Sequence, residues 1–174
     1  VTHGLIQENK LNFDKSQNDD MVLTYHDSCN VARASRMGDK AGGQFEIPRN
    51  IIKNVCNNFY DMPKDTIKEG TYCCGGGGGL LTDDLMELRV KGALPRMEAL
   101  RQVVEDNGVT HMAAICAICK SQFAKVFPYY DFTMDQIVSV HQLVSNAIIL
   151  TGQHDENDEN DGENHPQQDI DEAA

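Results

Sequence analysis

The order of apolar and polar positions along the chain predicts short strands that alternate with helices. Residues 21–25 form a β-prone run bounded by polar residues, and residues 109–115 form a second apolar run of strand length. Residues 57–62 carry a weaker strand signal, and residues 132–133 predict a minimal strand. We expect the segments between these runs to be helical.

Apolar residues recur at helical spacing in most of the remaining segments. The segments predicted to be helices are 29–37, 48–55, 82–107, 119–126 and 134–150. Within the third segment, Gly92 and Pro95 are expected to break the pattern into two helices, and Gly108 provides a stop signal. Alternating strands and helices are typical of an α/β domain, so we predict a Rossmann-like, open, mostly parallel sheet flanked by helices.

Charge divides the chain into two parts. The 174 residues have a formal net charge of −12, and residues 155–174 hold nine of the 27 acidic side chains but no Lys or Arg. This segment has one Ile and no aromatic residue, so it cannot bury enough apolar surface to fold. We expect a cysteine-rich domain over residues 1–153 and a disordered acidic tail over residues 154–174, which either keeps the protein soluble or docks a basic partner.

Composition argues against two classes of function. Nucleic-acid binding is not expected, because phosphate recognition needs a basic surface, and because aromatic residues, on which bases stack, make up only 6% of the chain and include no Trp. No segment approaches the roughly 18 apolar residues that span a bilayer. Residues 1–10 lack the basic-then-apolar order of a signal peptide. We therefore expect no direct membrane span and a reducing, cytoplasmic location.

Five of the six cysteines occur in three segments that each follow a predicted strand. These five are Cys29, Cys73, Cys74, Cys116 and Cys119. Loops that follow parallel strands converge at one edge of a sheet, so we expect the five thiols to meet there. Cys56 lies outside this pattern and is expected to be a buried structural residue.

Three interpretations of the thiols stay open on the residues alone. Structural packing does not explain two adjacent cysteines beside five glycines, and disulfides do not suit a reducing compartment. A metal site agrees with Cys116-x-x-Cys119 at a strand-to-helix turn, and five thiols exceed the four ligands of structural zinc. The cysteines therefore favour an iron–sulfur centre over zinc.

The glycines and nearby cations suit such a centre. Gly75, Gly76 and Gly77 are candidate cofactor-binding residues, because glycine lets the backbone approach sulfur and offer N–H donors to it. No Gly-Lys-Ser/Thr follows the run, so it is not a nucleotide-phosphate loop. The positive charge to balance several thiolates is expected from three residues near the cysteines: Arg33, Arg36 and Lys120.

The cysteine motif resembles the CCG domain of heterodisulfide reductase catalytic subunits. His26-Asp27-Ser28-Cys29 is similar to the first motif of that family, with Ser in place of the usual Pro, and Cys73-Cys74-Gly followed by Cys116-x-x-Cys119 is similar to the rest. The glycine run and residues 89–96 are most similar to the DsrK group, the cytoplasmic iron–sulfur subunits of the membrane complex associated with dissimilatory sulfite reductase. The resemblance covers about residues 1–150 and implies that the chain is the C-terminal portion of a larger subunit.

The resemblance also implies a cofactor, a reaction and partners. It implies a noncubane [4Fe–4S] cluster held by Cys29, Cys73, Cys74, Cys116 and Cys119, with Cys73 and Cys74 as catalytic residues. The reaction would be reduction, or formation, of the disulfide or trisulfide of a DsrC-like protein with redox-active cysteines. Electrons would pass through a haem-bearing membrane subunit, with which the protein would associate peripherally.

Alternatives to this function stay open. His26 precedes Cys29 by three residues, and it either protonates a leaving thiolate or is a strand-end histidine hydrogen-bonded to Asp27. Cys116-Ala-Ile-Cys119 also resembles the active site of a cluster-free, thioredoxin-like dithiol oxidoreductase. The third alternative is a zinc-stabilised interaction module without enzymatic activity.

Overall fold

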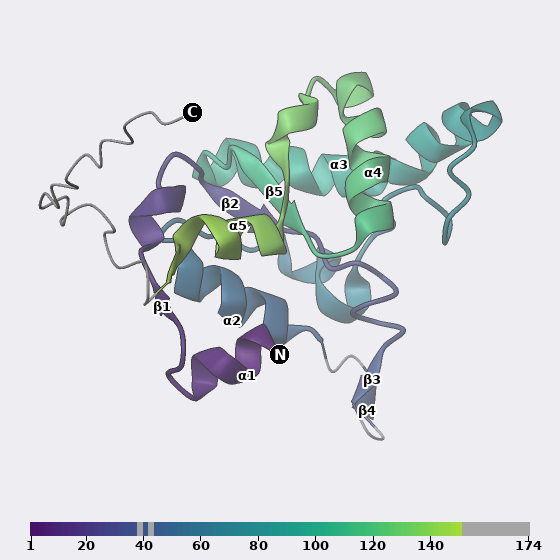
Figure 1. The fold of residues 1–174 in the computed structure, drawn as a ribbon. Coiled ribbons are helices and arrows are strands. Elements are labelled where there is room, and N and C mark those ends of the chain that lie inside the picture. Colours follow the sequence, from purple (N-terminus) through teal and green to yellow (C-terminus); the bar gives the residue numbers. More distant parts are fainter. Residues whose placement is uncertain (38–39, 42–43, 151–174) are drawn as a thin grey trace, which may run out of the picture.

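A computed structural model of the chain describes residues 1–37, 40–41 and 44–150 (Figure 1). The acidic tail predicted over residues 154–174 lies outside the described residues. Among the residues described, no helix combines the length and the apolar character that crossing a bilayer requires. The 22-residue helix α3, Met86–Asn107, is long enough but carries many charged side chains.

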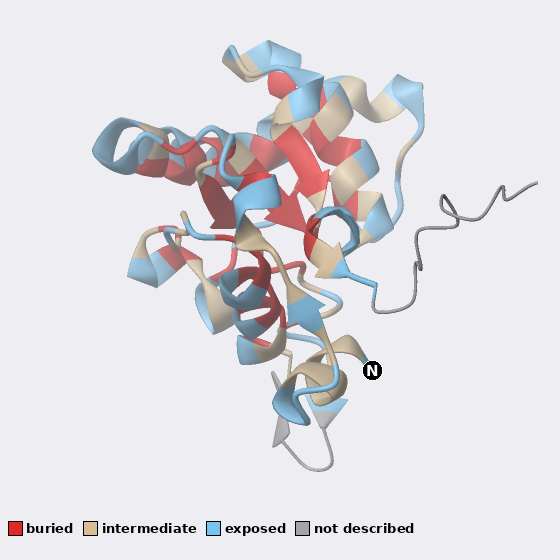
Figure 2. Cartoon of the chain, turned by 60° about the vertical axis from the view of Figure 1, so that its left-hand side comes forward, coloured by how far each residue is buried: buried red, intermediate tan, exposed pale blue. Residues whose placement is uncertain are grey.

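A small parallel sheet lies at the centre of the fold. Its three strands have the order β2-β5-β6, and they comprise Leu23–Tyr25, His111–Ala114 and Ile137–Ser139. In the register of the sheet, Tyr25 is opposite Ala113, which is opposite Val138 on the other side. The strands are largely buried, as short apolar strands covered on both faces must be (Figure 2). The Rossmann-like fold stays a prediction.

The predicted strands agree with the structure at two of four places. The runs 21–25 and 109–115 contain β2 and β5, but the weak strand at 57–62 contributes only an isolated bridge between Leu23 and Phe59. Residues 132–133 are not a strand, and β6 lies instead inside the segment predicted as the helix 134–150. A short, buried apolar strand has no periodicity of its own, so its pattern merged with that of the following helix.

Four helices cover the sheet. They are α2, Glu46–Val55; α3, Met86–Asn107; α4, Ala117–Val126; and α5, Val140–Ala147. The prediction that α3 would be two helices was wrong, because it continues through Pro95 to a left-handed stop at Gly108. Burial of Ala93, Met97 and Leu100 along α3 offsets the hydrogen bond that proline removes.

The predicted helix 29–37 does not form. Residues 29–34 make turns, and Arg36–Met37 and Lys40–Ala41 pair as the small antiparallel strands β3 and β4. The hydroxyl of Ser35 donates to the carbonyls of Val31 and Ala32, and such side-chain bonds compete with helix continuation. The remaining elements are the helix α1, Thr2–Gln7, and the antiparallel pair β1, Asn12–Phe13, and β7, Ile148–Ile149.

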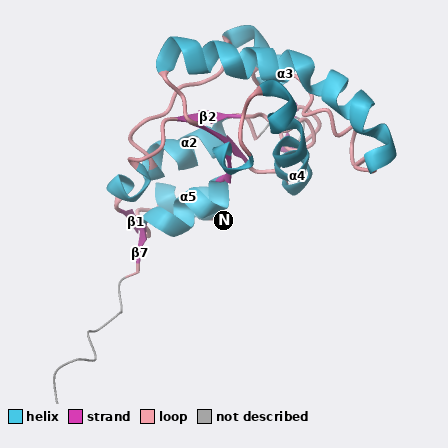
Figure 3. Cartoon of the chain, turned by 90° about the horizontal axis from the view of Figure 1, so that it is seen from above, coloured by secondary structure: helices cyan, strands magenta, loops and turns pink. Residues whose placement is uncertain are grey.

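The sheet separates two apolar cores. Met112 and Ala114 of β5 point into a core with buried residues of α3 and α4, whereas Ala113 points into a core with residues of α2 and α5. Seen from above, α2 and α5 lie together and away from α4 (Figure 3). Cys74 and Cys119 belong to the first core, and Cys56 belongs to the second, as its predicted structural role requires.

Candidate functional site

The loops after two neighbouring parallel strands carry cysteines at the same edge of the sheet. Cys29 lies four residues after the end of β2, and Cys116 lies two residues after the end of β5, where it is the N-cap residue of α4. Cys119 lies in the first turn of α4 and is buried. Both cysteines of α4 are close enough to the Tyr25 hydroxyl, at the end of β2, to raise its pKa, although burial contributes most to that rise.

The thiols of Cys73, Cys74 and Cys119 form a row in which each lies close enough to the next to change its titration. The Cys74 thiol, together with burial, raises the pKa of Cys73 above its usual range. The Cys119 thiol has the largest effect on Cys74, whose pKa rises to about 12. The row begins at the surface with Cys73 and ends inside the protein with Cys119.

The structure therefore brings three of the five predicted ligands, Cys73, Cys74 and Cys119, close together. The other two, Cys29 and Cys116, lie just after the ends of the adjacent strands β2 and β5. All six cysteines are free thiols. Across residues 1–37, 40–41 and 44–150, no three His, Cys, Asp or Glu side chains converge on a point where one metal ion would sit. The thiols are thus arranged as an extended row rather than as a compact shell.

Backbone N–H groups of the glycine loop, residues 75–79, lie around the outer end of this row of thiols. The N–H of Gly75 donates to the Cys73 sulfur at 3.3 Å. The backbone N–H groups of Gly75 and Gly77 work to lower the pKa of Cys73, and that of Gly76 works to lower the pKa of Cys74. Such donors stabilise a thiolate more than a thiol.

Gly75 is required by a close approach to α3. Its φ is +87°, and a Cβ at this position would lie 2.2 Å from the carbonyl oxygen of Arg89. On the helix side, a Cβ built on Gly92 would lie 3.5 Å from the Cα of Gly75, which is an ordinary van der Waals contact. Gly75 thus lets the cysteine loop rest directly on α3.

His26 is buried with both ring nitrogens unsatisfied among the described residues. Its backbone N–H donates to Ala113, and its ring packs edge-on against Phe123 at 4.8 Å. Burial, with a smaller effect of Arg96, holds the pKa of His26 well below its usual value. The expected proton-donor role of His26 stays a prediction, and burial works against it because it favours the neutral ring. The alternative, a hydrogen bond to Asp27, was wrong, because other groups occupy that carboxylate.

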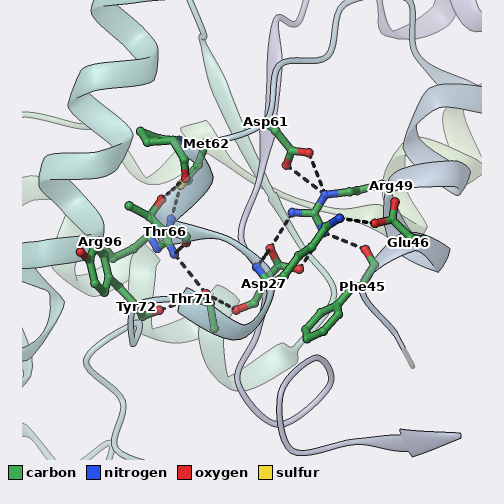
Figure 4. A network of polar contacts seen from close by, with 12 residues as sticks. Asp27, Phe45, Glu46, Arg49, Asp61, Met62, Thr66, Thr71, Tyr72 and Arg96 are labelled. Atoms are coloured by element: carbon green, nitrogen blue, oxygen red, sulfur yellow. Dashed lines mark hydrogen bonds and ion pairs between the residues drawn. The ribbon is translucent and has the colours of Figure 1, made fainter. Parts of the chain in front are cut away.

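Asp27 ties the first cysteine loop to the rest of the site (Figure 4). Its carboxylate accepts two hydrogen bonds from Arg49 of α2, at 2.8 and 2.6 Å, and one from the backbone N–H of Lys68 at 2.9 Å. Its carbonyl accepts a hydrogen bond from Thr71, which lies two residues before Cys73. Both side chains of the Asp27–Arg49 pair are 1% exposed, and Asp61, at 31%, binds the other side of the guanidinium.

Two further buried arginines were missed by sequence reasoning. Arg89 and Arg96 lie two turns apart on α3 and are 2% and 0% exposed. The guanidinium of Arg96 binds neutral groups, namely Met62, the Thr66 carbonyl and the Thr71 hydroxyl, and it lies 5.7 Å from the centroid of the Tyr72 ring. Burial lowers the pKa of Arg96 to about 10. Arg89 binds Gln122 and has exposed Asp83 at 3.7 Å.

The cations expected from the sequence lie nearer the surface than these arginines, and their role in balancing the thiolates stays a prediction. Arg33 and Arg36 are exposed, and Arg33 donates to the Glu69 carbonyl. Lys120 is half-buried at the start of α4. Two signals in the sequence pointed to this pair: the similarity of residues 89–96 to the DsrK group, and the seven-residue spacing, which places two residues on one helix face.

Comparison with known proteins identifies the family. The sequence model of the CCG family, described as a cysteine-rich domain, matches residues 23–124, which include all five motif cysteines. The chain belongs to the CCG family. The resemblance drawn from the cysteine motif is therefore confirmed. No solved structure matches the chain.

The relatives of this CCG domain are proteins of larger size. The Hdr-like menaquinol oxidoreductase iron-sulfur subunit 2 of Archaeoglobus fulgidus is 45% identical over 148 residues, which cover 85% of this chain and 25% of that protein. A subunit of the dihydromethanophenazine:CoB–CoM heterodisulfide reductase of Methanosarcina acetivorans is 32% identical over 123 residues, covering 67% of this chain and 25% of that protein. The chain thus spans about a quarter of the length of these relatives.

The buried ion pair gives the first prediction. Asp27→Asn should lower the free energy of unfolding by about 3 kcal/mol, because it leaves the buried Arg49 with one remaining carboxylate. Asp61→Asn is the matched control, and it should cost below about 1 kcal/mol because this carboxylate is partly exposed. Urea denaturation of the reduced CCG domain measures both values. If both variants lose the same free energy of unfolding, Asp27 contributes no more to the fold than Asp61 does.

The glycine loop gives the second prediction. Gly75→Ala should lower the free energy of unfolding by about 3 kcal/mol, because the methyl group adds an overlap with α3 to the strain of a positive φ. Gly78→Ala should cost only about 1 kcal/mol, since Gly78 also has a positive φ, +77°, but has nothing within 4 Å of the added carbon. The same denaturation experiment compares them. If Gly75→Ala lowers the free energy of unfolding no more than Gly78→Ala does, the loop does not rest on α3.

Proposed function

We propose that this CCG domain is the cluster-binding, disulfide-reducing part of an Hdr-like oxidoreductase. Cys29, Cys73, Cys74, Cys116 and Cys119 would hold an iron–sulfur cluster of the noncubane [4Fe–4S] type. The single observation that carries the proposal is the row Cys73–Cys74–Cys119 at the edge where β2 and β5 deliver Cys29 and Cys116. Relatives named as an iron-sulfur subunit and as part of a heterodisulfide reductase support it.

The residues at the site fit an anionic, sulfur-rich group. The donor set consists of free thiols, which are the ligands that iron–sulfur centres take. Backbone N–H groups of the glycine loop already point to sulfur. Arg89 and Arg96 supply buried positive charge, and their hydrogen-bond partners in the described part of the chain are neutral. A bound cluster would supply one-electron redox chemistry at this point.

The surface beside Cys73 is shaped to receive a substrate. A cavity of about 200 Å³ opens next to this thiol, and its wall includes Leu80, Leu85 and Leu88 as well as Gly75 and Gly77. Leu80 and Leu88 are 57% and 63% exposed. An apolar part of a substrate can bind here while its disulfide reaches the outer end of the thiol row. Cys73 and Cys74 are therefore the residues to which we assign contact with the reacting sulfur.

The proposed substrate and partners follow the resemblance to DsrK. The substrate would be the disulfide or trisulfide of a DsrC-like protein, and electrons would arrive from quinol through a haem-bearing membrane subunit, or leave by the same route. The name of the A. fulgidus relative, a menaquinol oxidoreductase subunit, supports a quinol-linked chain. The protein would then work in the cytoplasm, at the membrane surface, through its partner subunits.

The two alternative functions have weaker support. In a thioredoxin-like dithiol, Cys116 and Cys119 would form the working pair, but this function leaves Cys29, Cys73 and Cys74 without a role. A structural zinc ion needs a compact tetrahedral shell, and in the described part of the chain no three ligand side chains converge in that way.

Metal analysis tests the proposed function. Protein reconstituted anaerobically with iron and sulfide should hold several iron atoms and a matching amount of sulfide per chain, because the thiols outnumber the ligands of a single ion. Cys74→Ser should lose most of the iron, because Cys74 lies in the middle of the row. The matched control is Cys56→Ser, which should keep the parental content because Cys56 lies in the other core.

Two results would refute the proposal. One is a preparation with about one zinc per chain and no sulfide, which would favour the zinc module. The other is a cluster that survives in Cys74→Ser but is lost in Cys56→Ser, which would mean that the ligand assignment is wrong.

A further inference from the structure

The side-chain amide of Gln122 has an orientation fixed by its neighbour. Gln122 lies in α4, three residues after Cys119, and is 0% exposed. Its Oε1 accepts hydrogen bonds from Nε and Nη2 of Arg89, at 2.8 and 2.6 Å. Because a guanidinium has only donors, Oε1 must face Arg89 and the NH₂ group must face away from it.

The NH₂ group faces the cysteine loop. A Cβ built on Gly75 would lie 3.0 Å from Nε2 of Gln122, so the backbone of the loop passes close to the amide. A Cβ built on Gly76 would lie 3.6 Å from Cγ of Gln122 and 3.3 Å from the sulfur of Cys74. Gln122 and Cys119 are also three residues apart, on the same side of α4. The amide therefore lies beside the thiol row.

This NH₂ group has no partner within the described part of the chain. Leaving a buried donor unpaired costs on the order of 1–3 kcal/mol. A glutamate at position 122 would avoid that cost and would pair Arg89 more strongly, through two charged hydrogen bonds. Glutamine instead preserves the positive charge of Arg89 and adds a donor directed at the loop. This combination suits an electron-rich acceptor that occupies the site.

We propose that Nε2 of Gln122 donates a hydrogen bond to a sulfur of the bound cluster or to the thiolate of Cys74, and that it thereby sets the reduction potential. This inference rests on the proposed function, because the acceptor is the cluster and its ligands. Reduction adds negative charge to the sulfur atoms, so a fixed donor stabilises the reduced form more than the oxidised form. Gln122 therefore raises the potential, and Arg89 is the positioning residue that aims the amide.

The test is a redox titration followed by paramagnetic resonance, on the natural polypeptide that carries this chain, purified anaerobically. Gln122→Glu keeps the shape and the partner of Arg89 but replaces the donor with an anionic acceptor. It should lower the midpoint potential, so that the oxidised-to-reduced ratio at a fixed potential rises about tenfold, equivalent to about 59 mV for a one-electron couple. Gln122→Met, which removes the donor without adding charge, should shift the ratio in the same direction by a smaller factor.

Matched controls separate this role from charge and from folding. Gln102→Glu makes the same charge change at an exposed position of α3, 13 residues beyond Arg89 or roughly 20 Å along the helix, and should leave the potential unchanged. Arg89→Lys keeps the charge but loses the two-pronged donor, and it should lower the potential because the amide is no longer aimed. Iron and sulfide content and the melting temperature are measured for every variant.

The outcomes are distinct. Parental potentials in Gln122→Glu and Gln122→Met, with parental iron and sulfide content, would overturn the inference and leave Gln122 a structural role. If Gln122→Glu is unstable, Gln122→Met and Arg89→Lys decide the question by the same criterion. A parental protein that binds no iron and sulfide would refute the proposed function, and this inference with it.

Discussion

The site depends on the buried ion pair between Asp27 and Arg49. Asp27 belongs to the loop that leaves β2 toward Cys29, and it is bound at once by α2, by the backbone at Lys68 and by Thr71. Thr71 is two residues from Cys73, so this single aspartate fixes the distance between two cysteine segments that are 44 residues apart. A buried ion pair of this kind adds little net stability compared with apolar residues of the same size, and its main effect is the specific geometry that it imposes.

The buried arginines divide into two kinds. Arg49 is neutralised by Asp27 and Asp61, whereas Arg89 and Arg96 have neutral hydrogen-bond partners and, for Arg89, one exposed carboxylate 3.7 Å away. Uncompensated buried charge is costly in a protein interior, and it is expected where a functional anion offsets it. The N–H groups of the glycine loop favour negative charge on this row of sulfur atoms, and the proposed hydrogen bond from Gln122 would act in the same direction.

The sequence identified the cysteine motif but not its surroundings. The spacing of Cys29, the Cys73-Cys74 pair, Cys116 and Cys119 matches a family motif, and Cys29 and Cys116 follow the strands β2 and β5 as expected, whereas the segment predicted as a strand before Cys73 contributes only an isolated bridge. Arg96 and Gln122 could not be found, because nothing in a pattern shows that a polar side chain is buried without a charged partner. Two features of the fold depend on tertiary packing, which the local sequence does not show. One is that α3 continues through Pro95, and the other is that the strand β6 forms immediately before α5.

The central claim is that cysteines from three segments hold one multi-iron centre in an extended row. A crystal structure of the anaerobically loaded protein, measured at the iron absorption edge, tests it most directly. The account predicts one group of iron atoms bonded to the sulfurs of Cys29, Cys73, Cys74, Cys116 and Cys119, with Cys56 unbound. Iron bound by Cys116 and Cys119 alone, with Cys73 and Cys74 left as free thiols, would contradict it.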